Sequence, residues 1–184
     1  MQTITLDVER ARRNKAMDIR NQLPVHPLTP DAQPPDGADG SLRVGGLVAR
    51  PDTLTAATRA ELPRAPLTER FTCEEGWAVE GQAWEGIPLR EALAVCQPLP
   101  AARFVRVSAG SYWIALTLDQ IDHALLCDRL NGEPLSRAHG APWRLVVAGG
   151  ACFTSVKWVN ALELAAEPGE QTAEGIARGR LTGD

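Results

Sequence analysis

Residues 71–77 contain the side chains with the clearest potential for chemistry. The segment places Cys73 at the end of an apolar run, and two glutamates, a glycine and a tryptophan follow it. A thiol at the point where a strand gives way to a glycine-containing turn is held by rigid backbone and stays accessible to a ligand. Cys73 is therefore the first candidate for a functional residue.

Three roles are open for Cys73. As a nucleophile it would need a base to form the thiolate, and the adjacent carboxylates of Glu74 and Glu75 oppose that ionisation. As a metal ligand it would be deprotonated by the metal itself, so the carboxylates interfere less. As a buried cysteine it would only pack. Among the functional roles the arrangement favours metal ligation. The metal should bring most of its ligands with it, because no ligand spacing relates the histidines, which are His26, His123 and His139.

Hydrogen-bond donors gather in a second segment, residues 139–157. A glycine pair, Gly149-Gly150, lets backbone approach a ligand closely there. The group fits a site for a phosphate and a heterocycle, with a lysine as point charge and backbone N–H groups as cradle. Taken singly, each side chain is more often solvated than functional. The candidates are His139, Arg144, Ser155 and Lys157.

Composition excludes several classes of protein. The 184 residues suit one domain with a substantial core, and the net charge of −4 without a basic cluster argues against a nucleic-acid partner. No apolar run reaches the roughly 20 residues that span a bilayer. No apolar segment follows Arg12-Arg13, so we expect a cytoplasmic protein, or a periplasmic one if a leader has been removed. The four cysteines form no CxxC pair and should be free thiols.

The fold class expected from the pattern is α+β, with a mixed β-sheet and short helices. Short strands and helices alternate without a regular βαβ period, which argues against a doubly wound fold. Strands are predicted over residues 41–48, 67–73, 104–108, 112–118, 144–148 and 155–164, and a short strand or an ordered loop over 77–84. Helices are predicted within 51–62, with Thr55 as N-cap, and over 86–96 and 119–127.

The predicted helix over 119–127 would place His123 and Cys127 one turn apart. This pair is a weak metal hypothesis, because two ligands do not make a site, and packing is the favoured role. Tyr112 is the only tyrosine in the chain. Its type alone suits a core residue as well as a proton donor.

Taken together, the motifs resemble the molybdopterin-binding domain of the sulfite oxidase family, and within it the catalytic subunits of the molybdenum methionine-sulfoxide reductases. The resemblance covers nearly all of residues 19–164 and rests on the order and spacing of short motifs. These are Arg20-Asn-Gln-Leu-Pro24, Cys73-Glu-Glu-Gly-Trp77, Trp84-Glu-Gly-Ile-Pro-Leu89, Gly110-Ser-Tyr112, Asn131-Gly-Glu-Pro-Leu135, His139-Gly-Ala-Pro142, Arg144-Leu-Val-Val147 and Ser155-Val-Lys-Trp158.

The resemblance implies a cofactor of molybdenum and molybdopterin, with an oxo-molybdenum centre held by a dithiolene pterin and one protein thiolate. By position that thiolate is Cys73. Tyr112 matches the family's active-site tyrosine, placed to hydrogen-bond an oxo group or a substrate oxygen, and Glu75 is the third catalytic candidate. Contacts to the pterin and its phosphate are implied for Arg20, Asn21, Gln22, His139, Arg144, Ser155 and Lys157. The implied domains are an arm over 1–18, the molybdopterin-binding domain over 19–166 and an exposed tail over 167–184.

Departures from the family pattern bear on the substrate. Gln22 stands where relatives often have histidine, Cys152 where many have glycine, and Thr154 where sulfite oxidases have a basic residue. Sulfite oxidases also place an arginine shortly after the ligand cysteine, where this chain has Glu75 and its neighbours. A carboxylate about 6 Å from a bound anion costs roughly 3 kcal/mol at an effective dielectric constant of 20. We therefore expect oxygen-atom transfer on a small neutral S-oxide or N-oxide rather than on sulfite.

Other functions stay open. The chain could carry the cofactor without turnover, it could oxidise sulfite, or it could be a cofactor-free thiol enzyme that uses Cys73. As an enzyme it lacks the β-sandwich domain and the haem segment of eukaryotic-type sulfite oxidases. We therefore expect a minimal catalytic domain with a separate electron-transfer partner, a haem or flavin protein.

Overall fold

The structure is a computed structural model that describes residue 23 and residues 40–72 and 78–182. The predicted arm over 1–18 lies outside these residues. The motif from Arg20 to Pro24 also lies outside them, apart from Leu23. Of the helices in the described ranges, none is long and apolar enough to cross a membrane.

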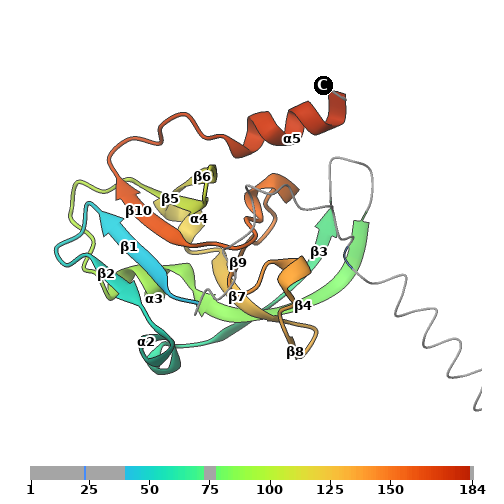
Figure 1. Ribbon diagram of the computed structural model, residues 1–184, viewed down its shortest axis with the longest axis horizontal. Helices are drawn as coiled ribbons and strands as arrows, with labels where there is room; N and C mark the ends of the chain where they lie inside the picture. Colours follow the sequence, from blue (N-terminus) through green and yellow to red (C-terminus); the bar gives the residue numbers. More distant parts are fainter. Residues whose placement is uncertain (1–22, 24–39, 73–77, 183–184) are drawn as a thin grey trace, which may run out of the picture.

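The first sheet is mixed, as the sequence predicts. Its five strands lie in the order β2-β1-β10-β5-β6 (Figure 1). β1 and β10 run parallel, and the other neighbours are antiparallel. The strands are β1 (Leu42–Gly46), β2 (Asp52–Leu54), β5 (Phe104–Ala109), β6 (Tyr112–Thr117) and β10 (Ala161–Ala165).

The second sheet is antiparallel, and its edge strand β3 ends just before the predicted cysteine segment, which lies outside the described residues. Its strands lie in the order β3-β4-β7-β8, and β9 pairs with β7. Their bounds are β3 (Ala65–Thr72), β4 (Ala78–Pro88), β7 (Ala124–Leu130), β8 (Glu133–Pro134) and β9 (Arg144–Val147). Cys73 follows the last residue of β3.

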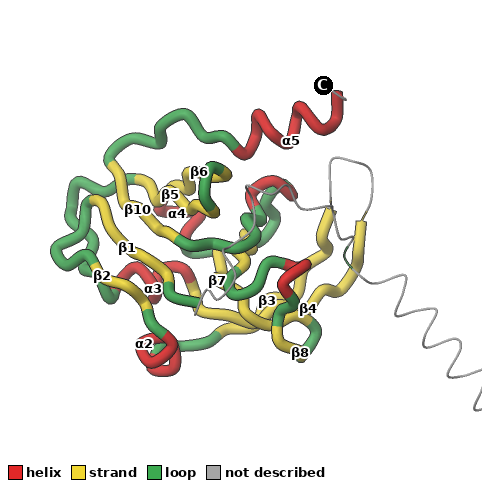
Figure 2. The backbone as a smooth tube through the Cα atoms, viewed as in Figure 1, coloured by secondary structure: helices red, strands yellow, loops and turns green. Residues whose placement is uncertain are grey.

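Short helices cover the sheets, which makes the α+β class correct (Figure 2). They are α2 (Ala56–Glu61), α3 (Leu89–Ala94), α4 (Leu118–Ile121), α5 (Ala173–Thr182) and the 3-10 turns η2 (Arg137–His139) and η3 (Cys152–Thr154). Two local features follow from the types of a few neighbouring residues, the start of α2 and the turn between β7 and β8. The Thr55 side chain accepts from the Thr58 N–H at 3.3 Å and caps α2. Asn131 and Gly132 both have positive φ and form the tight turn between β7 and β8.

Two clusters of buried side chains hold the fold together. The main core joins both sheets and includes Val44, Val107, Leu162, Ile87, Leu126 and Leu145. A smaller cluster lies on the second sheet and includes Leu23, Phe71, Trp84, Cys127 and Val146. Burial of each large side chain contributes about 1.5–3 kcal/mol. The second cluster also fixes Leu23, one residue after Gln22, beside the end of β3.

The predicted helix over 119–127 is wrong beyond its first turn. Thr117 and Gln120 form a capping box that starts α4, but α4 ends at Ile121, and Ala124 begins β7. The first four residues of β7 are all buried. A short continuous apolar run of this kind fits a buried strand as well as a helix, and periodicity cannot separate the two. His123 and Cys127 therefore do not lie one helical turn apart.

Two further boundaries differ from the prediction. The helix predicted from Gly86 begins at Leu89, because the three preceding residues extend β4. The last strand begins at Ala161 rather than at Ser155. Trp158 has a φ of +57°, which strand backbone does not accommodate.

The C-terminal segment is more ordered than the predicted exposed tail over 167–184. It carries α5, and Ala173 is fully buried in the main core. The Trp113 N–H at the edge of the first sheet donates to Thr172 Oγ1 at 3.1 Å, and the Ala115 N–H donates to Gln171 Oε1 at 3.3 Å. Side chains of this segment thus bond the open edge of β6, which would otherwise expose unpaired donors.

Candidate functional site

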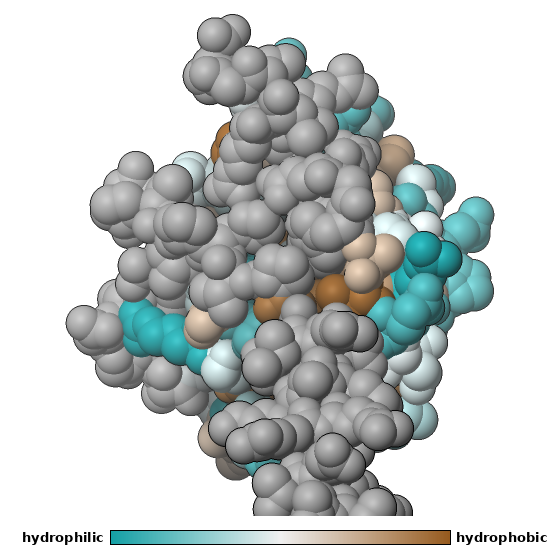
Figure 3. All heavy atoms as spheres, turned by 90° about the vertical axis from the view of Figure 1, so that its right-hand side faces the viewer, coloured by the Kyte–Doolittle hydropathy of each residue, from teal (hydrophilic) through white to brown (hydrophobic). Residues whose placement is uncertain are grey.

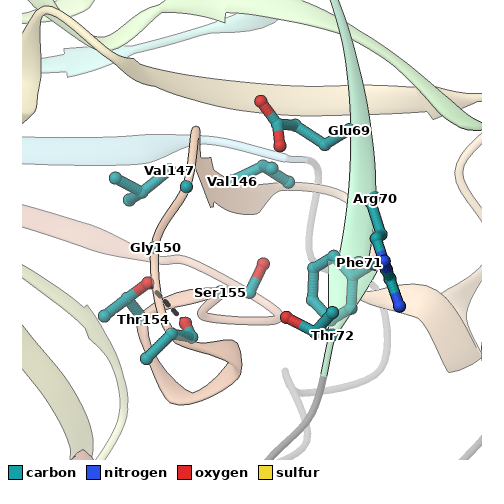
Figure 4. A pocket seen from close by; sticks show the side chains of 11 residues that line it. Glu69, Arg70, Phe71, Thr72, Val146, Val147, Gly150, Thr154 and Ser155 are labelled. Carbon is teal, nitrogen blue, oxygen red and sulfur yellow. Dashed lines mark hydrogen bonds between the residues drawn. The ribbon is translucent and has the colours of Figure 1, made fainter. Parts of the chain in front are cut away.

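A cleft opens at the carboxyl end of β3. β3 forms one wall, and β9 with the loop through η3 forms the other (Figure 4). It holds about 420 Å³, open solvent at its mouth included. Glu69 and Phe71 extend from the cleft side of β3, and Arg70 extends from its other side. The remaining lining residues are Thr72, Val146, Val147, Gly149, Gly150, Ala151, Thr154 and Ser155.

The lining combines apolar and polar side chains. The face of the molecule on the right-hand side of Figure 1 shows hydrophobic atoms near its middle and hydrophilic atoms toward its edges (Figure 3). At the cleft, Arg70 Nε lies 3.0 Å from Glu80 Oε1 in an exposed ion pair. This leaves Glu69 as the charged side chain of the lining that forms no ion pair with another described residue.

Arg144 is the most unusual charged residue of the site. It is 5% exposed, and its guanidinium carbon lies 5.0 Å from the ring centres of both Phe71 and Trp84. Burial lowers the pKa of the Arg144 guanidinium to about 10, so the group stays charged at neutral pH. Its Nε has no hydrogen-bond partner, and neither has the buried Nε1 of Trp84. Among the described residues no carboxylate pairs with Arg144, so the arrangement lacks an acceptor or an anion.

The carbonyls of η2 connect the candidates that the sequence singled out in residues 139–157. Lys157 Nζ donates to the Ala138 carbonyl at 2.9 Å. Arg144 Nη1 donates to the next carbonyl, that of His139, at 3.2 Å. Arg144 and Lys157 also form a β-bridge through their backbones. The turn therefore fixes both cations side by side, although they are 13 positions apart in the sequence.

His139 joins this turn to the N-terminal part of the chain. Its Nε2 lies 3.1 Å from the Leu23 carbonyl, and its Nδ1 lies 2.8 Å from Ser136 Oγ. A carbonyl only accepts, so Nε2 carries the proton, and Nδ1 of the neutral ring accepts from the serine hydroxyl. His139 thus bonds Leu23, the residue that follows the predicted Arg20-Asn21-Gln22 segment in the sequence.

Ser155 and Tyr112 hold the loop wall of the cleft. Ser155 Oγ donates to the Leu145 carbonyl at 3.0 Å. The Tyr112 hydroxyl donates to the Phe153 carbonyl of η3 at 2.8 Å. A Cβ on Gly150 would lie 2.6 Å from Thr154 Oγ1, so only glycine fits at this place in the wall.

The remaining candidates lie outside the described residues. They are Arg20, Asn21, Gln22, Cys73 and Glu75, and their roles stay predictions. The structure brings the other candidates to one region around η2, η3 and β9. Sequence reasoning missed Glu69 and the two rings that flank Arg144. The signal that could have found Glu69 and Phe71 is the alternation of side chains along a strand, which puts both residues on one face of β3.

Residues 29–173 match the family described as the oxidoreductase molybdopterin binding domain, a span of more than half of the chain. The chain belongs to this family. Membership places it among the molybdenum-cofactor oxidoreductases of the sulfite oxidase family and implies that it binds molybdenum and molybdopterin.

Individual relatives cover parts of this molybdopterin-binding domain. Mitochondrial sulfite oxidase of Drosophila melanogaster is 29% identical over 175 residues, 83% of this chain and 30% of the relative. The protein-methionine-sulfoxide reductase catalytic subunit MsrP of Xanthomonas axonopodis pv. citri is 30% identical over 139 residues, 64% of this chain and 42% of the relative. The chain thus spans less than half the length of either relative.

A solved structure supports the fold. The crystal structure of the sulfane dehydrogenase SoxCD from Paracoccus pantotrophus superposes with a TM-score of 0.64 at 24% identity. The match covers 80% of this chain and 42% of that chain. It confirms the molybdopterin-oxidoreductase fold that the sequence motifs predicted.

The described residues fit a cofactor that carries a phosphate. Arg144 and Trp84 stack against each other, and each has a buried N–H donor without a hydrogen-bond partner, Nε of Arg144 and Nε1 of Trp84. Lys157 adds a second cation beside Arg144. An anionic group bound to these donors would supply the counter-ion that the buried guanidinium of Arg144 lacks.

Replacing Arg144 with methionine should separate folding from cofactor binding. In the cofactor-free protein the loss of one charged hydrogen bond and two ring contacts is offset by removal of an unpaired buried charge, so stability should change by only about 1 kcal/mol. Cofactor affinity should fall roughly 10- to 100-fold, because a charged hydrogen bond to the phosphate is lost. Chemical unfolding and molybdenum content measure the two effects.

Arg106 offers a matched control for this prediction. Its guanidinium carbon lies 5.6 Å from the Trp113 ring centre and its Nε donates to the Pro168 carbonyl, away from the cleft. Arg106→Met should leave molybdenum content unchanged. Full molybdenum content in Arg144→Met would exclude a role for Arg144 in cofactor binding.

Proposed function

We propose that this chain is the catalytic domain of a molybdenum enzyme that reduces a small neutral S-oxide or N-oxide by oxygen-atom transfer. The observation that carries the proposal is the charge of the cleft. Its described lining presents the carboxylate of Glu69, whereas the cation of Arg70 is paired with Glu80. Such a lining favours a neutral ligand over an anion.

The size of this preference follows from Coulomb's law. A unit negative charge about 8 Å from the Glu69 carboxylate is disfavoured by about 2 kcal/mol at an effective dielectric constant of 20. This corresponds to about 30-fold weaker binding of an anion such as sulfite. If the cofactor phosphate neutralises Arg144, that cation no longer offsets the repulsion.

The names of the relatives support the reaction class and leave two substrates to compare. One similar protein is a protein-methionine-sulfoxide reductase subunit, which acts on a neutral S-oxide, and another is a sulfite oxidase. The absence of a basic residue at Thr154 favours the first of these. We also propose that a separate haem or flavin protein donates the electrons.

In this proposal each candidate residue has a distinct role. Cys73 would ligate molybdenum, while Arg144 and Lys157 would hold the phosphate and His139 would fix the segment that follows Arg20. When bound, the cofactor supplies two-electron oxygen-atom chemistry. The overall reaction consumes one S-oxide, two electrons and two protons and yields the sulfide and water. The apolar walls around Phe71 and Val146 limit access of bulk water to the reacting atoms.

Turnover assays on metal-loaded protein test the proposal. With a reduced dye as donor, S-oxides and N-oxides should be reduced, and sulfite with an oxidised dye should show a high KM. Glu69→Gln should lower the KM for sulfite about 30-fold and change the KM for a neutral S-oxide less than about twofold. Sulfite oxidation at micromolar KM by the unaltered protein would refute the substrate class. Full molybdenum occupancy without any turnover would favour a cofactor carrier instead.

A further inference from the structure

β6 is an edge strand of the first sheet, and it presents backbone donors outward. Among the described strands it is last in the sheet order, with β5 as its neighbour. In an antiparallel pair, alternate residues turn their N–H groups away from the neighbouring strand. On β6 these residues are Trp113, Ala115 and Thr117. An edge of this kind is a template onto which another strand can pair.

Two of the outward donors are held by the segment that precedes α5. Thr172 Oγ1 accepts from the Trp113 N–H at 3.1 Å, and its hydroxyl donates in turn to the Ser111 carbonyl at 2.8 Å. The adjacent Gln171 accepts from the Ala115 N–H through Oε1. Thr172 therefore gives and receives a hydrogen bond at the edge, as a residue of a paired strand would.

The third outward donor is held from the other end of β6. The Thr117 N–H donates to Gln120 Oε1 at 2.9 Å, as part of the capping box that starts α4. Each of the three outward N–H groups of β6 thus ends on a side-chain oxygen. In this arrangement none of the three is open to an incoming strand.

A clamp on the first sheet fixes the segment that closes the edge, residues 167–172, which we call the strap. Arg106 Nε donates to the Pro168 carbonyl at 3.2 Å, and its Nη2 donates to the Glu167 carbonyl at 3.2 Å. The same guanidinium lies against the ring of Trp113. After the strap, α5 packs on the β6 side of the sheet (Figure 1). The strap is therefore held at both ends while it crosses the edge.

The sequence of β6 makes a second copy of the chain the most direct partner for an open edge. Tyr112–Thr117 has six residues, YWIALT, without a charge or a proline, and most of them are aromatic or β-branched. Segments of this length and composition pair with copies of themselves when they are exposed on an edge. Two identical antiparallel strands also satisfy the same donors and acceptors on both sides.

We propose that the β6 edge is a pairing surface for β6 of a second copy of this chain, and that Gln120 and the strap keep it closed. Release of the strap frees the N–H groups of Trp113 and Ala115, and the two strands then pair in antiparallel orientation. The inference concerns the first sheet alone, so it does not depend on the proposed reaction.

Sedimentation of the full chain with Gln171→Ala and Thr172→Val tests the proposal. The double variant removes two side-chain acceptors and leaves the sequence of β6 unchanged. Its mass should rise with concentration from that of a monomer toward that of a dimer, a step that the unsubstituted chain should lack. Gln171→Ala alone leaves Thr172 at the start of α5 and should show the same step more weakly.

Amide hydrogen exchange at low concentration shows whether the edge has opened. In the double variant, exchange at Trp113 and Ala115 should rise about fivefold or more, because each amide loses its acceptor. Ile114 and Leu116 face β5 and should stay protected, which shows that the ladder between β5 and β6 persists. A variant with this exchange pattern that stays monomeric at high concentration would overturn the proposal.

A further substitution identifies the surface through which the copies associate. Ala115→Pro removes an outward N–H from the middle of β6 and leaves the hydrogen bonds to β5 in place, since proline is tolerated on an edge strand at such a position. Added to the double variant, it should return the chain to a monomer. Association that persists in the triple variant would place the contact elsewhere and overturn the proposal.

Thr55→Val is the matched control. It removes the hydroxyl that caps α2, which contacts β2 at the opposite edge of the first sheet. This variant should gain no association step. Association of Thr55→Val to the same extent as the double variant would show that lost stability, rather than an open β6 edge, drives it, and would also overturn the proposal.

Discussion

Replacing Cys73 with serine should remove molybdenum from the purified protein and lower turnover more than 100-fold. Loss of an outer partner of a metal ligand costs about 10–100-fold in affinity or activity, and loss of the ligand itself should cost more. Serine keeps the size of the side chain but is not a thiolate at neutral pH. Elemental analysis, pterin fluorescence and the absorption spectrum of protein from a cofactor-producing host measure the effect.

Cys152 provides the matched control. It is a half-buried cysteine of η3, in the loop wall of the cleft, so Cys152→Ser makes the same chemical change nearby. This variant should keep its molybdenum and its spectrum. Unaltered molybdenum and spectrum in Cys73→Ser would exclude Cys73 as the ligand. Absence of both metal and pterin from the unsubstituted protein would remove the enzyme proposal and leave the fold intact.

Replacing Gly86 with alanine should destabilise the protein by at least about 3 kcal/mol. A Cβ on Gly86 would lie 2.1 Å from the Leu126 carbonyl oxygen and 2.6 Å from Cys127 Cα, and both of these are backbone atoms. They cannot move without separating β4 from β7 at the register shift beside Gly86. The expected cost is at the upper end of that for overpacked sites, because backbone rather than a side-chain end must shift.

Gly45 in β1 tests whether the effect is specific. A Cβ there would meet nothing within 4 Å, and its φ lies outside the left-handed region. Gly45→Ala should therefore change the free energy of unfolding by less than about 1 kcal/mol, with a gain expected from reduced unfolded-state entropy. Equal unfolding midpoints for Gly45→Ala and Gly86→Ala would contradict the close approach of the two strands.

Where neighbouring residues decide structure, the sequence was a good guide. Alternating apolar residues marked β5, and Asn131-Gly132 marked a turn that needs positive φ. Thr55 marked the start of α2 through one local hydrogen bond. The order and spacing of the motifs also pointed to the family, and through it to the cofactor, and the match over residues 29–173 confirms the family. The roles of Cys73 and the other site residues stay predictions.

The tertiary structure decided what depends on distant contacts. β7 is a strand because it pairs with β4 and β9 on either side, which a local apolar pattern cannot reveal. Arg144 contacts the rings of Phe71 and Trp84 because three strands, β9, β3 and β4, meet there. The Tyr112 hydroxyl donates to the Phe153 carbonyl, 41 positions away, a contact that the sequence does not reveal. The sequence thus determined which chemical groups the chain has and in what order. Packing determined which of them face the cleft, because the sheets bring together side chains that lie far apart in the chain.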